Sequence, residues 1–109
     1  MTFEQYQKQS RETAIYPDKG RNFIYPTLGL AGEAGEVAEK IKKVLRDKGG
    51  IVDETVRQEL AKELGDVLWY LSQIATELNL SLEEIAAKNI EKLLSRKGRG
   101  VLGGDGDNR

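Results

Sequence analysis

The chain has 109 residues, of which 32% are charged and 39% hydrophobic, and its formal net charge is −1. This length suits one domain with a modest core, and the balanced charge gives no overall field that would recruit nucleic acid or a membrane surface. Neither cysteine nor histidine occurs, which excludes disulfides, thiolate or imidazole metal sites and histidine-based catalysis. No apolar run approaches about 20 residues and no signal-peptide pattern opens the chain, so we expect a cytoplasmic protein.

The first predicted helix lies near the N-terminus, within residues 2–15. Thr2 and Gln5 fit a capping box at its start, and Pro17 should stop it. Residues 16–27 are then predicted to form a loop that mixes aromatic side chains with Arg21 and Asn22. This loop could be part of a pocket wall that meets a planar base, or a loop pinned to the core by its aromatic side chains. The sequence favours neither interpretation.

A second helix is predicted from about Pro26 or Thr27 to Lys48, because proline suits a first turn and two glycines follow Lys48. Within it, Glu33 and Glu36 are three residues apart and therefore share one side. Like charges at this spacing repel each other unless something positive lies between them. The core stripe beside the two acids consists of Leu30, Ala34, Val37, Ile41 and Val44.

A third helix is predicted over residues 54–78, with Asp53 as its N-cap. Glu63 and Asp66 repeat the spacing of the first acidic pair and lie in the same relation to an apolar stripe. If the two stripes pack antiparallel, the four carboxylates converge beside the core. Between residues 64 and 76 the only charged residue is Asp66, so we expect this segment to be buried on more than one side. A carboxylate there needs a metal or an ion partner.

The four acids allow two interpretations. Because the chain offers only oxygen ligands, a metal cluster would favour Mg²⁺, with Mn²⁺ also possible. Alternatively, the acids make structural ion pairs with Lys40 or Lys92. Lys40 lies on the same side of its helix as Glu33 and Glu36, whereas its basic neighbours form a solvated face.

A fourth helix is predicted over residues 82–96, opened by a capping box that Ser81 forms with the glutamate three residues later. Asn89, Lys92 and Arg96 share one side of it. A basic strip near four acids is reasonable if both face one ligand, with the acids holding a metal and the strip holding a polyphosphate. Otherwise, the strip is a solvated basic helix end.

Residues 1–97 are predicted to form one all-α domain, and residues 98–109 a glycine-rich, flexible tail. The third helix carries Gly65, Trp69 and Ser72 on its uncharged back. We expect these residues to need cover that a single subunit does not supply, which indicates a homodimer or homotetramer.

With these motifs the sequence resembles the MazG-like nucleotide pyrophosphohydrolases, an all-α family related to dimeric dUTPases. The resemblance is carried by residues 28–36 and 63–69 and by the order and spacing of the helices, over roughly residues 20–96. The ending Gly-Asp-Gly-Asp-Asn-Arg is also similar to that of single-domain members. The resemblance implies a four-helix bundle assembled as a dimer or a dimer of dimers. One departure is Lys62, where many members have an acid, and it leaves the number of bound metals open.

The resemblance further implies hydrolysis of a (deoxy)nucleoside triphosphate between the α and β phosphates, giving a nucleoside monophosphate and pyrophosphate. The catalytic and metal-binding residues would be Glu33, Glu36, Glu63 and Asp66. The residues assigned to phosphate or substrate binding are Lys40, Asn89, Lys92 and Arg96. Without an imidazole, the proton of the attacking water would pass to Glu36 or Glu33, or to hydroxide on the metal.

Two other classes of protein could also use acidic pairs on packed helices. A di-iron carboxylate oxidoreductase would need a Glu-x-x-His motif, and the absence of histidine speaks against it. A non-catalytic helical module that binds nucleotides or another protein remains the alternative. Such a module would give no magnesium-dependent product.

Overall fold

The computed structural model describes residues 1–109 and consists of four α-helices without a strand. In chain order the helices are α1 (Phe3–Arg11), α2 (Ile24–Asp47), α3 (Glu54–Glu77) and α4 (Leu82–Gly98). The all-α prediction is therefore confirmed. None of the four helices combines the length and hydropathy that crossing a bilayer requires.

Three of the helices begin at the polar side chains that the sequence indicated. Thr2 and Gln5 form the reciprocal capping box of α1. Asp53 accepts a hydrogen bond from the backbone amide of Val56 at 2.9 Å and caps α3. Ser81 caps α4 by accepting from a backbone amide of the first turn, without the reciprocal bond of a capping box.

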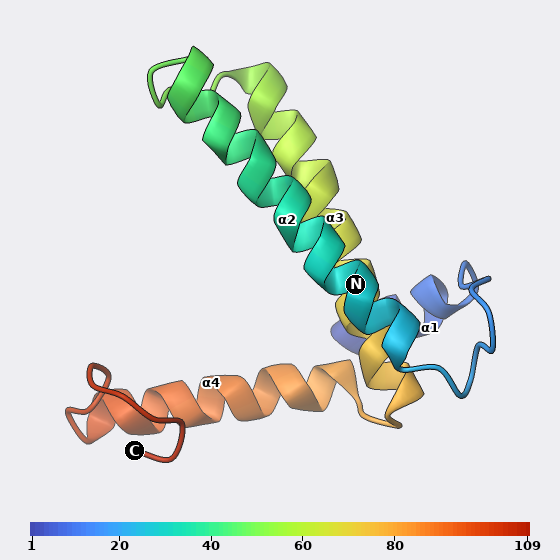
Figure 1. Cartoon of the computed structure of the whole chain (residues 1–109). Helices are drawn as coiled ribbons and strands as arrows, with labels where there is room; N and C mark the ends of the chain where they lie inside the picture. Colours follow the sequence, from blue (N-terminus) through green and yellow to red (C-terminus); the bar gives the residue numbers. More distant parts are fainter.

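The two longest helices, α2 and α3, run antiparallel and make the most extensive contact in the chain (Figure 1). Val44 and Val56 are buried where the two helices meet near their connecting loop. Toward the other end, the ring of Tyr70 lies against Gly29, where an added Cβ would lie only 2.2 Å from the ring. Glycine is therefore required at position 29 for α2 to approach α3 this closely.

The short helix α1 packs across the C-terminal half of α3 through polar side chains. The hydroxyls of Ser10 and Ser72 lie 3.0 Å apart, and the amide of Gln73 donates to Ser10 at 3.1 Å. Ser72 and Gln73 are fully buried, and the indole of Trp69 donates to Thr13 at 2.8 Å. The expected need for cover by a second subunit is therefore wrong for Ser72, which α1 covers within the chain. It stays a prediction for Trp69, which is half-buried, and for Gly65, which is exposed.

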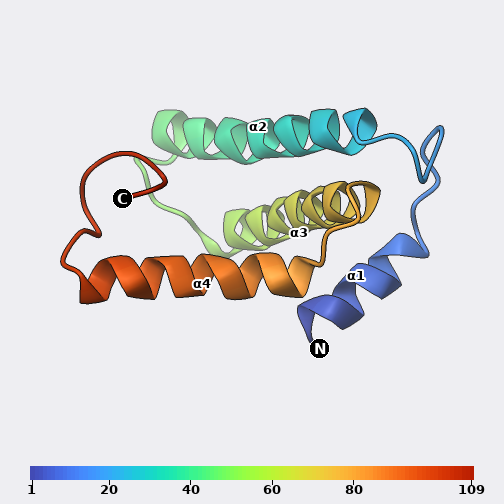
Figure 2. The same cartoon turned by 90° about the horizontal axis from the view of Figure 1, so that it is seen from below.

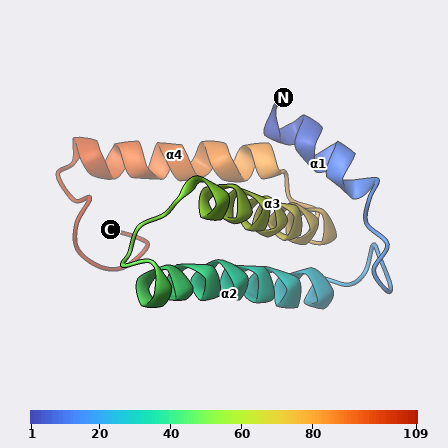
Figure 3. The same ribbon diagram turned by 90° about the horizontal axis from the view of Figure 1, so that it is seen from above.

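The last helix, α4, diverges from the α2–α3 pair and packs mainly against α1 (Figures 1 and 2). The view from above shows the same arrangement, with α1 beside the start of α4 (Figure 3). The radius of gyration is 16.9 Å, against about 13 Å expected for a compact domain of this length. Only 11 of the 109 residues are buried. A single chain therefore positions its four helices without enclosing a large core between them.

The tail after α4 has no regular secondary structure and folds back over the end of that helix (Figure 1). The guanidinium of Arg109 stabilises the folded shape of the tail. It donates hydrogen bonds to the backbone carbonyls of Val101, Leu102, Gly103 and Gly106. The backbone amide of Val101 also donates to the carbonyl of Arg96 at 2.8 Å. These bonds tie the tail to itself and to α4.

Candidate active site

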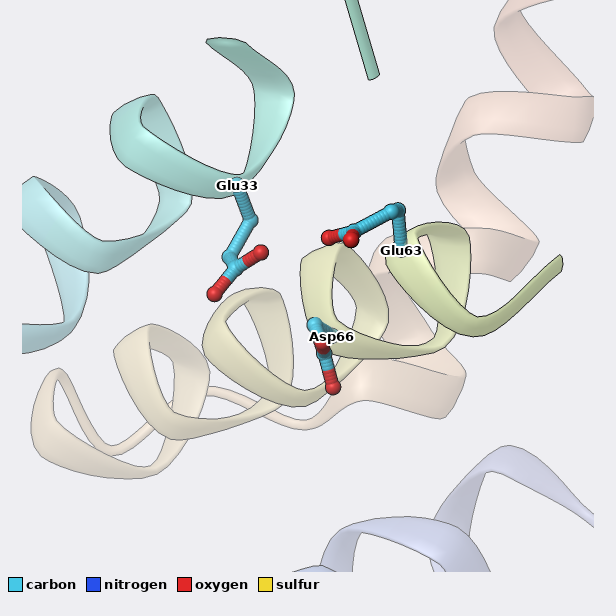
Figure 4. Close-up of side chains that lie close together, drawn as sticks. All are labelled: Glu33, Glu63 and Asp66. Atoms are coloured by element: carbon cyan, nitrogen blue, oxygen red, sulfur yellow. The ribbon is translucent and has the colours of Figure 1, made fainter. Parts of the chain in front are cut away.

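Three carboxylates converge near the middle of the α2–α3 pair. Glu33 projects from α2 toward α3, where Glu63 and Asp66 lie one turn apart (Figure 4). One oxygen from each of the three groups lies within 4.8 Å of the other two. Glu33 and Glu63 are half-buried, and Asp66 is exposed. Antiparallel packing of the two stripes brings these acids together, as their spacing indicated.

The fourth predicted acid, Glu36, lies one turn after Glu33 on α2 and outside the group of three. It is exposed to solvent. Its negative charge still reaches Glu33 and contributes to raising the pKa of that residue. The structure therefore places Glu36 at the edge of the cluster, which we call the acidic cluster and define by Glu33, Glu63 and Asp66.

The acidic cluster has no positively charged partner in the chain. None of the ion pairs in the structure involves Glu33, Glu63, Asp66 or Glu36. Lys40 lies 3.7 Å from Glu59, one turn before Glu63, and Lys92 binds a residue of the tail. The lysines named as structural partners of the acids are therefore engaged elsewhere.

The unbalanced negative charge of the cluster affects the pKa of Glu33. Burial raises its pKa first, and a hydrogen bond shared with Glu63 and the negative charges of Asp66, Glu63 and Glu36 raise it further. Each of these effects disfavours the ionised form of Glu33. A cation among the three carboxylates would act in the opposite direction.

The cluster fits a divalent metal that prefers oxygen. Oxygens bound to one Mg²⁺ at about 2.1 Å are about 3 to 4.2 Å apart, and the three oxygens here lie within 4.8 Å of one another, so side-chain rotations could bring them to one ion. Mg²⁺ also keeps several waters and needs few protein ligands, which suits a partly exposed set of three. The donor set contains neither sulfur nor nitrogen, as hard cations require.

Two tyrosines lie near enough to the acidic cluster for its charges to raise their pKa, and neither was among the predicted site residues. Burial raises the pKa of Tyr70, and the charges of Glu33 and Asp66 add to this effect. The pKa of Tyr6, on α1, is raised by burial and then by Asp66. Tyr70 follows Asp66 by four residues on α3, so helical periodicity alone could have placed it on the side of the acids.

The loop between α1 and α2 is anchored by one buried acid, Glu77, at the end of α3. Its fully buried carboxylate accepts from Arg11 at 2.7 Å, from the hydroxyl of Tyr16 at 2.6 Å and from the backbone amides of Gly20 at 2.9 Å and Asn22 at 2.6 Å. Burial alone would raise the pKa of Glu77, but these hydrogen bonds lower it to about 2. Sequence reasoning missed this residue, because nothing adjacent to it distinguishes it from a surface acid.

Two tyrosines, one in this loop and one at the start of α2, stack against each other. Tyr16 is buried, and Tyr25 stacks on it with 5.0 Å between ring centroids. The rings of Trp69 and Tyr16 are nearly perpendicular, with 6.4 Å between their centroids. Residues 16–23 therefore form a loop that is pinned to the core, whereas residues 24–27, predicted as part of that loop, form the first turn of α2. Tyr25, in that turn, remains 43% exposed, so contact of this region with a base stays a prediction.

The predicted basic strip lies apart from the acidic cluster within one chain. Asn89, Lys92 and Arg96 are on α4, which packs mainly on α1 rather than on α2 and α3. Asn89 is exposed, whereas Arg96 is 5% exposed and binds the tail together with Lys92. The structure thus brings together the acids but leaves the strip separate from them.

Comparison with known proteins identifies one family for most of the chain. The family model of the MazG nucleotide pyrophosphohydrolase domain matches residues 26–100, which include all eight predicted site residues. The gene 37 protein of Mycobacterium phage L5 is 49% identical over 109 residues, covering 95% of this chain and 96% of that protein. The acetyl-coenzyme A carboxylase carboxyl transferase subunit alpha of Teredinibacter turnerae is 30% identical over 83 residues, which are 76% of this chain but 26% of that protein. No solved structure matches the chain.

Proposed function

The chain belongs to the MazG nucleotide pyrophosphohydrolase family, and on that premise we propose that it hydrolyses (deoxy)nucleoside triphosphates in a Mg²⁺-dependent reaction. Cleavage falls between the α and β phosphates and gives a nucleoside monophosphate and pyrophosphate. The observation that carries this proposal is the acidic cluster, whose three carboxylates lie within 4.8 Å of one another with no positive side chain paired to them.

Glu33, Glu63 and Asp66 would hold the metal, for which Mn²⁺ is an alternative to Mg²⁺. When bound, the metal supplies the positive charge that the cluster lacks and polarises the phosphate to be attacked. Its charge also keeps Glu33 ionised, against the burial and the neighbouring acids that raise its pKa. The three side chains thus position the reacting phosphate over the middle of the α2–α3 pair.

The proton of the attacking water would pass to Glu36. This carboxylate is exposed, lies outside the group of three and is close enough for its charge to act on Glu33. Because Glu36 is not one of the three metal ligands, it can accept the proton without any ligand leaving the metal. Asn89 and Lys92 would bind phosphate oxygens, with Arg96 and Lys40 as further basic groups that offset charge on the departing pyrophosphate.

The proposal includes a homodimer or homotetramer, because one chain keeps the basic strip away from the acidic cluster. A second copy could bring its own α4 to the acids and cover apolar side chains that are exposed in the single chain. Those more than half exposed on the paired helices and on α4 include Leu28, Leu64, Ile90 and Leu94. A monomer seen by light scattering at micromolar concentration would contradict this part of the proposal.

The test is pyrophosphate release from a panel of ribo- and deoxynucleoside triphosphates, with Mg²⁺ and with the metal removed by chelation. We expect Mg²⁺-dependent release from at least one substrate. Glu63→Gln should lower kcat by about 100-fold or more while the helical circular dichroism spectrum is unchanged. Glu54→Gln is the matched control, because it makes the same change at an exposed position of α3.

Two outcomes would contradict the proposal. Absence of pyrophosphate from every substrate, with nucleotide binding retained, would identify a binding module instead of an enzyme. Full turnover by the Glu63 variant would show that the chemistry takes place outside the acidic cluster.

A further inference from the structure

The C-terminal tail places a carboxylate on the basic strip of α4. One oxygen of Asp107 accepts from the ammonium of Lys92 at 2.8 Å and from the guanidinium of Arg96 at 3.1 Å. The backbone carbonyl of Asp107 accepts a second bond from the same guanidinium nitrogen. These contacts lower the pKa of Asp107, so the carboxylate is ionised at neutral pH.

Asp107 uses the groups that a phosphate would use. A phosphate oxygen and a carboxylate oxygen both accept charge-assisted hydrogen bonds from lysine and arginine at about 2.7–2.9 Å. Asp107 is the ion-pair partner of both Lys92 and Arg96. Because Arg96 is 5% exposed, a ligand can reach its guanidinium only if the tail moves.

From this geometry we propose that Asp107 is an internal competitor of the polyphosphate, and that the tail must leave Lys92 and Arg96 before the substrate can bind them. The proposal rests on the proposed function, since it assigns these two residues to the substrate's phosphates. It adds a form of regulation: the chain carries its own inhibitor of phosphate binding at its C-terminus.

A triphosphate can displace Asp107 from Lys92 and Arg96. The side chain of Asp107 is 78% exposed and that of Lys92 is 39% exposed, so water screens their interaction. One carboxylate brings a single negative charge, whereas a triphosphate brings several charges and several oxygens to the same donors. A triphosphate therefore replaces Asp107 with a net gain in contacts to Lys92 and Arg96.

The tail has a folded shape that presents Asp107. Arg109 donates to four backbone carbonyls between residues 101 and 106 and closes this segment into a loop. Gly104 and Gly106 adopt left-handed backbone conformations, with φ of +96° and +87°, that the loop requires. The loop continues directly from the end of α4, so the tail can leave the strip without disturbing the helices.

Beside the strip there is room for the incoming group. An open hollow of about 340 Å³ is lined by Ile85, Lys88, Asn89 and Lys92. Three of these four side chains can donate hydrogen bonds to phosphate. A polyphosphate in this hollow would reach Lys92 first, and displacement of Asp107 would then free Arg96.

The experiment measures binding of inorganic tripolyphosphate, without Mg²⁺, to the full chain by calorimetry at fixed ionic strength. Asp107→Asn should bind about three- to tenfold more tightly, because the ligand no longer displaces a charged group. Asp105→Asn is the matched control: this aspartate lies in the same loop and contacts only the backbone amide of Gly106. It should bind like the unmodified protein.

A second pair of variants tests whether Asp107 acts through Lys92. In a Lys92→Met background, adding Asp107→Asn should change tripolyphosphate affinity by clearly less than it does alone. The same Asp107 variant should lower the KM for a nucleoside triphosphate by a similar factor with kcat within about twofold. Asp107→Ala should behave like Asp107→Asn, which separates loss of the charge from any effect specific to asparagine.

Equal binding by the Asp107 and Asp105 variants would overturn the proposal, and so would weaker binding by Asp107→Asn, because the aspartate would then be helping the ligand. These outcomes differ from failure of the proposed function. If no nucleotide is hydrolysed but Asp107→Asn binds tripolyphosphate more tightly, the enzymatic assignment fails and the competition stands. If hydrolysis is normal and the variants bind alike, only the competition fails.

Discussion

Glu33 and Glu77 are acids of the same helix pair, and their surroundings are opposite. The side chain of Glu77 is fully buried and receives hydrogen bonds from Arg11, Tyr16 and two backbone amides, which lower its pKa to about 2. Glu33 is half-buried, has no basic partner and faces other acids, and its pKa is raised. The protein itself supplies the hydrogen-bond donors and the counter-charge that Glu77 needs, whereas it leaves Glu33 without a counter-charge.

This difference separates a structural acid from a functional one better than burial does. Burial by itself raises the pKa of both groups, and only the hydrogen bonds and neighbouring charges give the two shifts opposite signs. A carboxylate that is satisfied within the chain stabilises the fold. A group of carboxylates that repel one another costs stability, which a bound cation recovers.

The largest expected effect comes from removing the charge of Glu33. Glu33→Gln should lower kcat for pyrophosphate release by about 100-fold or more, since it removes a metal ligand. Its free energy of unfolding without metal should be unchanged or higher, because one repelling charge is gone. Steady-state kinetics and urea denaturation measure the two quantities. Glu39→Gln, at a half-exposed position of the same helix that is outside the acidic cluster, is the control. Normal turnover by Glu33→Gln would contradict the assignment of Glu33 as a functional acid.

Acid should act on Glu77 next. Its folded-state pKa of about 2 lies below the ordinary value of 4.5, so its contribution to stability is present above about pH 4.5 and is lost as the pH falls toward 2. Lowering the pKa of Glu77 from 4.5 to about 2 corresponds to about 3 kcal/mol of stability at neutral pH. Glu33 has a raised pKa, so its effect has the opposite sign: ionisation above its ordinary pKa destabilises the metal-free protein. Urea denaturation between pH 2 and 7, at fixed protein concentration, measures the sum.

Neutralising Glu77 by mutation isolates its share of that pH dependence. Glu77→Gln should lower the free energy of unfolding at pH 7 by about 2–3 kcal/mol, because Arg11 loses its ion partner at a largely buried site. The variant should also flatten the stability curve between pH 5 and 2. Its Mg²⁺ affinity should stay that of the unmodified protein, since the acidic cluster is intact. If the variant lost as much stability between pH 5 and 2 as the unmodified protein, other carboxylates would determine that loss.

The parts of this structure that depend on local patterns could be predicted from the sequence. Thr2, Asp53 and Ser81 cap their helices because a side-chain oxygen and an amide of the next turn are all that a cap requires. The convergence of Glu33 with Glu63 followed from two equal spacings placed beside two apolar stripes. In each case the information lies within a few residues.

The parts that depend on contacts between distant residues could not be predicted. Glu77 binds groups that lie 55 to 66 positions away in the chain, and no short motif records that meeting. Helical periodicity indicates which face of α4 is apolar but not which helix covers it, so its divergence from α2 and α3 was not foreseen. The same limit applies to Asp107, which a glycine-rich composition assigned to a flexible end although it is bonded to Lys92 and Arg96.

The smallest expected effect is a gain of stability on metal binding, and this gain should differ between the Glu33 and Glu77 variants. Mg²⁺ at about ten times its dissociation constant should stabilise the unmodified protein by about 1.4 kcal/mol, since only the folded chain assembles the acidic cluster. Glu77→Gln should show the same gain from its lower starting stability, whereas Glu33→Gln should show little. Thermal unfolding at equal protein concentrations, with Mg²⁺ or with K⁺ at matched ionic strength, measures it. An equal gain in the Glu33 variant would mean that Mg²⁺ binds elsewhere, because the unpaired carboxylates of the cluster are what should make stability depend on the cation.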